Sequence, residues 1–378
     1  MKLLFFQAGF GAGGAEKIIA MIAANRAAQG DEVHVAALTI PDGGSFFSYP
    51  DTVRLHPMCR ESQAPGRRVQ WHRLRHIRRV IRQTQPDVVI SFLTKVNTLV
   101  LLAALRLPVP VAISERNNPR VQNANPIWSH AQSLLARRAN CIVMQTERAR
   151  QDLPSGLHSR AVVIPNPCAP LGQSAASAGI GSNLVAVGRL DRQKGFDMLI
   201  DAMRPIRDAL PEARLTIFGE GRERAALEAQ RDRLGLSDNV FLPGTCPPGD
   251  WISGQDILVV SSRFEGFPNV IAEATVSGLP VVSFDCDYGP RELIRQGENG
   301  LLVPAEDNAA LARSVLDLAC DPERRAAMSR AADPTVEWLS PERVMRQWDR
   351  MIEGAATSAP VRSHPGKPAI TSSSSSKL

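Results

Sequence analysis

The segment from Ile257 to Ser277 constrains the fold of this chain more than any other. Its first four residues, Ile257 to Val260, form an uninterrupted aliphatic run that is typical of a buried strand in a parallel sheet. A turn with Gly266 follows, and residues 268–277 then have a helical composition, with Pro268 in the first turn, where its missing N–H is harmless. This order of strand, turn and helix predicts an open α/β sheet, in which ligands bind at turns of this kind.

The turn itself suits a ligand that carries both phosphate and hydroxyl groups. The backbone N–H groups of Phe267, Asn269 and Val270 are expected to point outward from the helix start, where the helix dipole attracts phosphate. Glu265 and Glu273 bracket the turn with seven residues between them. Because a carboxylate repels phosphate, the two are expected to accept hydrogen bonds from sugar and ribose hydroxyls. The alternative is a buried turn flanked by two solvated glutamates.

The sequence of residues 265–274, E-G-F-P-N-V-I-A-E-A, resembles the Glu-x7-Glu motif of the retaining family 4 glycosyltransferases. The resemblance implies the GT-B fold, an α/β architecture of two Rossmann-like domains that face each other across a cleft. It also implies that Glu273 binds the ribose of a nucleotide and that Glu265 contacts the transferred sugar. The residues implied to surround the diphosphate are Gly266, Phe267, Pro268, Asn269 and Val270.

A second motif, G-R-L-x3-K-G at residues 188–195, follows an expected strand. It resembles the pair of cations that holds the donor phosphates in the same family. Arg189 offers a planar fork to phosphate oxygens and Lys194 a compact charge, so together they can neutralise a departing diphosphate. The resemblance thus implies that Arg189, Lys194 and Glu265 act in catalysis, whereas the alternative is a pair of solvated charges.

The N-terminus begins with an expected strand and a glycine-rich loop at residues 8–15. This start also resembles a dinucleotide-binding fingerprint. Such a site needs an acidic residue after the second strand, where Thr39-Ile40-Pro41 stands instead. The favoured alternative is the G-G-A-E-K loop of family 4 enzymes, which implies that Gly13 approaches the acceptor and Gly14 the donor sugar.

Two further strands, expected at residues 87–92 and 109–114, end in polar loops. Because ligands bind beyond the carboxyl ends of parallel strands, both loops are expected to face the cleft. They resemble acceptor-side loops of family members that extend lipid-linked oligosaccharides. The resemblance implies acceptor contacts for Lys95, for Glu115 at the hydroxyl and for Arg116 at a phosphate. The alternative is that these are loop charges paired with their neighbours.

The length of 378 residues suits two domains of ordinary size. Residues 1–165 are predicted to form an acceptor-binding domain and residues 166–333 a nucleotide-sugar-binding domain, joined at the rigid Pro165-Asn166-Pro167 linker. A helix at residues 334–354 is expected to cross back to the first domain. Residues 355–378 are rich in Ser, Pro and Ala and are predicted to form a disordered tail.

Charge is divided unevenly between the two halves of the chain. Residues 1–165 carry 21 Lys or Arg and 10 Asp or Glu, whereas residues 166–378 carry 23 and 28. Residues 67–82 contain seven Arg, two His and no acidic residue, with aliphatic residues at helical spacing. This basic amphipathic helix is typical of contact with an anionic membrane surface; the alternative is a domain helix with a solvated arginine face. Nucleic acid is not expected as a partner, because no binding module for it is recognisable.

Other features narrow the class of protein further. The six Cys form no C-x2-C pair and no Cys/His cluster, so free thiols in a reducing cytoplasm are expected. No signal peptide and no run of 18 apolar residues is visible, so a peripheral place on the cytoplasmic face of the membrane is expected. Asp285-Cys286-Asp287 matches the metal motif of a different glycosyltransferase fold. GT-B enzymes need no such metal, and no metal or other cofactor is expected.

The sequence therefore predicts a retaining glycosyltransferase. It would move a sugar from a nucleotide diphosphate, expected to be UDP, to a hydroxyl of a lipid-linked or polysaccharide acceptor. One alternative is a sugar-nucleotide epimerase of the same fold. The alternatives from other classes are an NAD-dependent dehydrogenase and an inert nucleotide-sugar sensor. The missing acidic residue after the second strand argues against NAD.

Overall fold

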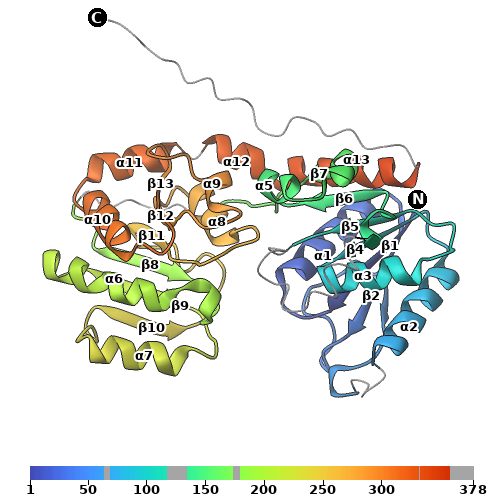
Figure 1. Cartoon of the computed structure of the whole chain (residues 1–378), viewed down its shortest axis with the longest axis horizontal. Helices are drawn as coiled ribbons and strands as arrows, with labels where there is room; N and C mark the ends of the chain where they lie inside the picture. Colours follow the sequence, from blue (N-terminus) through green and yellow to red (C-terminus); the bar gives the residue numbers. More distant parts are fainter. Residues whose placement is uncertain (64–68, 117–133, 173–178, 332, 358–378) are drawn as a thin grey trace, which may run out of the picture.

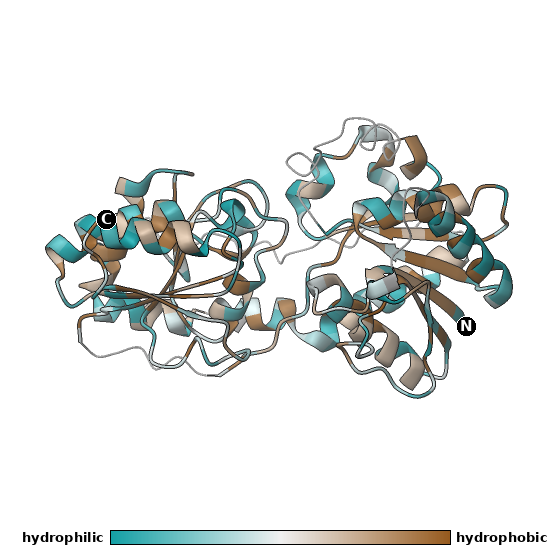
Figure 2. Ribbon diagram, turned by 90° about the horizontal axis from the view of Figure 1, so that it is seen from below, coloured by the Kyte–Doolittle hydropathy of each residue, from teal (hydrophilic) through white to brown (hydrophobic). Residues whose placement is uncertain are grey.

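The computed structural model describes residues 1–63, 69–116, 134–172, 179–331 and 333–357. Two α/β domains lie side by side, and each is built around its own parallel sheet (Figure 1). Figure 2 shows apolar strands inside each domain and polar helix faces turned outward. The expected architecture of two Rossmann-like α/β domains is therefore confirmed. Most of the expected tail, residues 358–378, lies outside the described part of the chain.

The first domain contains a seven-stranded parallel sheet. Its strands are β1 (Lys2–Gly9), β2 (Glu32–Thr39), β3 (Arg54–Pro57), β4 (Val88–Phe92), β5 (Val111–Ser114), β6 (Cys141–Met144) and β7 (Ala161–Val163). Its helices are α1 (Gly14–Ala28), α2 (Val69–Thr84), α3 (Thr94–Ala103) and α5 (Glu147–Gln151), with short 3-10 turns at Glu61–Gln63 and Ser155–Arg160. The strands lie in the order β3-β2-β1-β4-β5-β6-β7.

Both faces of this sheet are buried. Along β1, Leu3 and Phe5 pack into one core layer with α1, whereas Leu4 and Phe6 pack into the other with α2 and α3. Successive side chains of a strand point to opposite faces, so a strand that is covered on both sides is apolar along its whole length. This is why the N-terminal strand is readable from sequence as a continuous apolar run.

The second domain contains a six-stranded parallel sheet in the order β10-β9-β8-β11-β12-β13. These strands are β8 (Asn183–Val187), β9 (Arg214–Phe218), β10 (Val240–Gly244), β11 (Ile257–Val260), β12 (Val281–Phe284) and β13 (Gly300–Val303). The helices are α6 (Phe196–Ala209), α7 (Arg224–Arg233), α8 (Asn269–Val276), α9 (Pro290–Leu293), α10 (Asn308–Ala319) and α11 (Pro322–Arg330), with a 3-10 turn at Arg192–Lys194. Along β11, Ile257 and Val259 pack beneath α6 and α10, and Leu258 and Val260 pack beneath α8.

The strand order opens a crevice in each sheet. β1 lies between β2 and β4, and β8 lies between β9 and β11. At such points the connections leave in opposite directions, which creates a binding crevice at the carboxyl ends of the strands. The loops that follow β1, β8 and β11 are the glycine-rich loop and the two turns that the sequence motifs occupy.

The last two helices, α12 (Asp333–Leu339) and α13 (Pro341–Ala356), differ from the single helix expected at residues 334–354. Pro341 lacks the N–H that a continuous helix needs, so the chain bends there. The Ser340 hydroxyl then caps α13 by accepting a hydrogen bond from the Arg343 amide at 3.3 Å. Leu339 packs in the core of the second domain, whereas Trp348 is buried in the core of the first.

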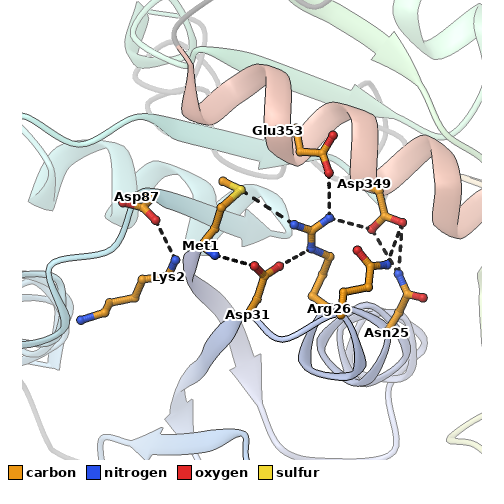
Figure 3. A network of polar contacts seen from close by, with 9 residues as sticks. Met1, Lys2, Asn25, Arg26, Asp31, Asp87, Asp349 and Glu353 are labelled. Carbon is orange, nitrogen blue, oxygen red and sulfur yellow. Dashed lines mark hydrogen bonds and ion pairs between the residues drawn. The ribbon is translucent and has the colours of Figure 1, made fainter.

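Polar contacts fix α13 to the first domain (Figure 3). The Arg26 guanidinium on α1 donates from Nη1 to Asp349 and Glu353, both at 3.2 Å, and from Nε to Asp31 at 2.6 Å. Asn25 donates to Asp349 at 3.1 Å. Because the Arg26 side chain is only 4% exposed, its charge needs these partners, and α13 is held in one position on α1.

One strand of the first domain was not expected. β3 has the sequence R-L-H-P and forms the edge of the sheet beside β2. A charged residue and a proline are common on edge strands, and they leave no apolar pattern that would predict the strand. A helix expected at about residues 127–138 lies mainly outside the described residues. Within the described residues, no helix has the length and apolar character needed to span a bilayer.

Candidate active site

A cleft of about 510 Å³ lies between the two domains, within the range of roughly 300 to 1,000 Å³ that is usual for small-ligand sites. Its walls combine the start of α1, the end of β5 and the turns after β8 and β11. Predicted site residues that line it are Gly13, Gly14, Arg116, Arg189, Lys194, Glu265, Gly266, Phe267, Asn269, Val270 and Glu273. The cleft thus brings residues of both domains into one place.

Two glycines position Lys194 in the turn after β8. A Cβ atom on Gly188 would lie 3.0 Å from Lys194 Cε, so the lysine stem crosses over bare backbone. Gly195 has a φ of +64°, and a Cβ there would lie 2.1 Å from the Ser261 carbonyl oxygen. A larger residue at 195 would therefore separate the two turns. The Ser261 hydroxyl also donates to the Lys194 carbonyl at 3.0 Å, which fixes the motifs to each other.

The two motifs meet in a buried ion pair. Lys194 Nζ lies 2.7 Å from Glu265 Oε1, and the Ser262 hydroxyl donates to the same oxygen at 2.6 Å. The lysine side chain is 17% exposed and the glutamate side chain 5%. In such a desolvated pair, removing one charge leaves the other uncompensated. An arriving diphosphate would provide Lys194 with a second anionic partner.

Arg189 lies at the mouth of the cleft. Its side chain is 73% exposed, with the Asp191 carboxylate 3.2 Å from its guanidinium. Gln193 connects this arginine to the second turn, because its amide oxygen accepts from Arg189 at 3.3 Å and its amide nitrogen donates to the Phe264 carbonyl at 3.1 Å. Exposed ion pairs of this kind are weak, so Arg189 is free to turn toward a ligand phosphate at little cost.

The start of α8 faces the start of α1 across the cleft. A Cβ atom on Gly14 would lie 3.8 Å from Asn269 Nδ2. The first amides of any helix lack an intrahelical acceptor, and the helix dipole adds a partial positive charge there. Asn269 is held in place by Asn166, which donates to its side-chain oxygen at 2.6 Å. The geometry therefore presents an anion-binding helix start to the cleft.

Arg116 joins this arrangement from the first domain. Its Nη1 donates to Asn166 Oδ1 at 2.6 Å, and its guanidinium lies 4.7 Å from the ring centre of Phe92 and 5.3 Å from that of Trp348. Two aromatic faces stabilise a cation in this position. Burial lowers the pKa of Arg116 to about 9, so the side chain remains charged at neutral pH.

Two carboxyl groups in the cleft wall have perturbed acidities. Burial raises the pKa of Glu273, and the charge of Lys17 opposes that change. Burial also raises the pKa of Glu16, against hydrogen bonds from the backbone of Glu16 and Gly9. An ionised carboxylate that has lost its water is stabilised by new hydrogen-bond donors, and the hydroxyl groups of a ligand can be those donors.

Three predicted site residues do not line the cleft: Lys95 and Glu115, which were expected at the acceptor, and Pro268, which was expected beside the diphosphate. Glu115 is 5% exposed and accepts hydrogen bonds from Thr94 and Asn97, each at 2.7 Å. It leads directly out of β5, where neighbouring side chains point to opposite sides, so Arg116 reaches the cleft and Glu115 does not. Lys95 is exposed on α3, and Pro268 precedes the first residue of α8.

The cleft also contains residues that sequence reasoning missed. Glu16, Gln193 and Asn166 all line it. Glu16 lies within the G-G-A-E-K loop and Gln193 within the G-R-L-x3-K-G motif, so both motifs carried a signal. Asn166 belongs to the linker, whose two prolines indicated rigidity but gave no sign of a contact between domains.

The Asp285-Cys286-Asp287 segment has other contacts in this structure. Asp285 pairs with Arg291, and the Asp287 carbonyl accepts from the Glu265 amide at 3.3 Å. Across the described ranges, no group of three or more His, Cys, Asp or Glu is arranged to hold a metal ion.

Family comparisons agree with this geometry. Residues 13–167 match the model of the glycosyl transferase 4-like domain, and residues 181–321 match the model of the glycosyl transferases group 1. Together the two models cover more than half of the chain. The chain therefore belongs to the family 4 type of glycosyltransferases, and it is a transferase of that class. This assignment favours glycosyl transfer over the epimerase and dehydrogenase alternatives.

Two curated relatives differ in how much of their length the chain matches. An uncharacterized glycosyltransferase of Haemophilus influenzae is 24% identical over 354 residues, which cover 93% of this chain and 99% of that protein. An exopolysaccharide phosphotransferase of Streptomyces coelicolor is 29% identical over 284 residues, which cover 73% of this chain and 29% of that protein. The chain thus spans less than a third of the second relative's length.

A solved structure confirms the fold. The Anabaena protein HepE, determined in complex with UDP and glucose, superposes with a TM-score of 0.77 at 19% sequence identity. The match covers 94% of this chain and all of that one. The domain arrangement is therefore the GT-B fold, as expected from the sequence.

Proposed function

We propose that this protein transfers a sugar from a UDP-sugar to a hydroxyl of a lipid-linked or polysaccharide acceptor, with retention of configuration at the anomeric carbon. The nucleotide sugar is the cosubstrate, and neither a metal ion nor another cofactor takes part. One observation carries the proposal. A single cleft holds the cations Arg189 and Lys194, the start of α8, and the carboxylates Glu265 and Glu273.

The distribution of charge in the cleft suggests how the donor lies. The diphosphate lies against Arg189, Lys194 and the start of α8, because these carry the positive charge. The ribose hydroxyls reach Glu273, and the transferred sugar lies near Glu265. The choice of UDP is supported by HepE, whose structure contains UDP and glucose. The acceptor class is supported by the exopolysaccharide named for the Streptomyces coelicolor relative.

The proposed chemistry is a front-side displacement. The acceptor hydroxyl oxygen forms a bond to the anomeric carbon while the bond from that carbon to the phosphate oxygen breaks, and the hydroxyl proton passes to the departing phosphate. Lys194, Arg189 and the α8 amides stabilise the negative charge that grows on the leaving group. Glu265 already accepts hydrogen bonds from Lys194 and Ser262, which makes it a poor nucleophile.

The donor is tested by calorimetry with UDP and GDP, followed by a hydrolysis screen across UDP-sugars and GDP-sugars. We expect UDP to bind and one UDP-sugar to be hydrolysed slowly. Preferential binding of GDP would contradict the choice of base. Proton NMR of the product made with an acceptor analogue reports its anomeric configuration, and an inverted product would contradict retention.

We also propose that the first domain binds an anionic membrane through a stripe on α2. Ile77, Val80 and Ile81 are buried, so the aliphatic side of this helix packs inward. Arg78 is not part of the stripe, since it donates to the Ala103 and Leu105 carbonyls at 2.6 and 3.0 Å and so caps α3. The stripe consists of Trp71, Arg75, Arg79 and Arg82, which are exposed and share one side at helical spacing.

Changing Arg75, Arg79 and Arg82 together to Gln should release the protein from vesicles of anionic phospholipid. Each arginine near such a surface contributes about 1 kcal/mol, so the partition coefficient should fall by roughly a hundredfold, measured by vesicle sedimentation at low salt. Rising salt should weaken wild-type binding, because exposed charges are screened within about 10 Å at 0.1 M.

The matched control changes three exposed arginines of the second domain, Arg204, Arg222 and Arg233, to Gln. It removes the same net charge and should leave vesicle binding unchanged. Arg78→Gln is expected to lower the melting temperature and to leave vesicle binding largely intact. Equal losses of vesicle binding in the two triple variants would show that only the net charge matters. Wild-type protein that does not bind the vesicles at low salt would contradict the proposal.

A further inference from the structure

Tyr288 crosses from one domain into the other. Its backbone belongs to the loop between β12 and α9 of the second domain, yet its side chain is 3% exposed and lies in a core layer of the first. The other buried members of that layer lie between Leu4 and Ala161. The Tyr288 hydroxyl donates to the Asp152 carboxylate, directly after α5.

The backbone at Tyr288 is held in an unusual conformation. Its φ is +59°, in the left-handed region that residues with a large side chain rarely adopt, and Gly289 follows with a φ of +100°. Such a conformation persists when the surrounding structure determines it. Here the ring fills a place in the first domain, while the flanking residues remain attached to the second. A further contact between the domains lies beside it, where the Arg148 amide donates to Glu292 at 3.2 Å.

The same loop touches residues 261–268, the turn between β11 and α8, which we name the donor turn. The Asp287 carbonyl accepts from the Glu265 amide at 3.3 Å. A Cβ atom on Gly289 would lie 2.1 Å from Pro268 Cδ, so the loop packs tightly against the residue before α8. The loop that carries Tyr288 therefore contacts both ends of the turn that leads from Glu265 to the start of α8.

We propose that Tyr288 is a positioning residue that couples closure of the two domains to the geometry of the donor turn. With its ring inserted in the first domain, the turn is held with Glu265 and the α8 amides in place for transfer. When the cleft opens to admit or release ligands, the ring withdraws and the turn relaxes. The inference rests on the proposed transfer from a nucleotide sugar, and UDP affinity is measured separately so that the two can fail separately.

Three variants test the coupling by kinetics. Tyr288→Ala should lower kcat at least tenfold and raise the Kd for UDP by a much smaller factor, because Arg189, Lys194 and Glu273 still hold the nucleotide when the turn relaxes. Tyr288→Phe and Asp152→Ala keep the ring and remove the hydrogen bond, so both should show the same, smaller loss. A Tyr288→Ala variant with wild-type kcat would overturn the proposal. So would an equal loss of UDP affinity and kcat, which would make the loop part of the donor site itself.

A spectroscopic test avoids variants that lack the ring. The chain has two tyrosines, Tyr49 and Tyr288, so protein labelled with 3-fluorotyrosine should give fluorine NMR signals from two sites, which Tyr288→Phe assigns. We expect the Tyr288 signal of the free protein to report two environments, and a UDP-sugar with an acceptor analogue to favour the buried one. The Tyr49 signal serves as the reference.

The outcomes of the NMR experiment are separable from those of the donor proposal. If calorimetry on the same sample shows bound UDP while Tyr288 keeps one environment in every state, the coupling is wrong. If no UDP binds, the choice of donor is wrong, and the coupling is then judged from the Tyr288 signal of the free protein. Two exchanging environments of Tyr288 support the coupling, and a single buried environment contradicts it.

Discussion

Replacing Lys194 with Met should lower kcat at least ~100-fold while the protein remains folded. The proposed function places the ammonium group at the leaving diphosphate, where its contribution is largest as the bond to the sugar breaks. Methionine keeps an aliphatic stem to cross over Gly188, so packing in the turn is preserved. Steady-state kinetics with the best donor measures the loss, and circular dichroism verifies the fold.

The ion pair with Glu265 requires a control. Without Lys194, the Glu265 carboxylate stays buried and loses its cation, so the melting temperature should fall. Adding Glu265→Gln removes the uncompensated charge and should restore stability without restoring kcat. Near-normal kcat in the Lys194→Met variant would show that Lys194 does not have the proposed catalytic role.

Arg189→Ala tests independently whether cations in the cleft stabilise the charge on the leaving diphosphate. Its side chain is 73% exposed, so the variant should keep its melting temperature and still lose kcat at least ~100-fold. An unchanged kcat would show that the arginine is only a solvated charge at the cleft mouth.

Local sequence signals predicted the elements that hold the proposed donor site. The aliphatic run Ile257 to Val260 is β11, and the helix expected from Pro268 is α8, which begins one residue later. Both carry strong signals, since the strand is buried on two faces and the helix has proline and glycine before it. β3 and the break at Ser340 carried weak signals: the first is a polar edge strand, and the second depends on a single proline within a helical composition.

Contacts between distant residues account for what the sequence could not predict in the site. The Lys194–Glu265 pair joins positions 71 residues apart in the sequence, so no local sequence pattern predicts the pair. Glu115 and Arg116 are adjacent in the chain, and only the direction of the strand end decides which one reaches the cleft. The path from Arg116 through Asn166 to Asn269 likewise exists only once both domains are folded.

Glu273→Gln should weaken the binding of free UDP by roughly 10-fold to 100-fold. The carboxylate is assigned to the ribose hydroxyls, and a hydrogen bond to a charged group contributes about 1.5–3 kcal/mol to a complex. Glu265→Gln should leave UDP affinity unchanged or tighten it, since Lys194 then faces the diphosphate without its carboxylate partner. The same Glu265 variant should impair use of the intact sugar donor. Calorimetry measures the first effect and steady-state kinetics the second.

Although Glu273→Gln should weaken UDP binding, it should raise the stability of the protein without ligand. Burial raises its pKa in the folded state, so the protonated carboxyl contributes stability that is fully present below the unfolded pKa. That contribution is lost as pH rises through the raised folded pKa. At neutral pH the ionised form is therefore a cost that glutamine removes, and Glu273→Gln should melt at a higher temperature than wild type. The difference should disappear in acid.

The acidity of Glu273 also predicts how UDP affinity depends on pH. Only the ionised carboxylate accepts hydrogen bonds from both ribose hydroxyls, so wild-type affinity should fall as pH drops through the raised pKa. The UDP phosphate titrates as well, and Glu273→Gln provides the correction because it retains that contribution and lacks the carboxylate. The ratio of the two affinities should therefore approach one in acid and widen toward neutral pH. A ratio that stays constant with pH, or equal losses of UDP affinity in Glu265→Gln and Glu273→Gln, would show that the ribose lies elsewhere in the cleft.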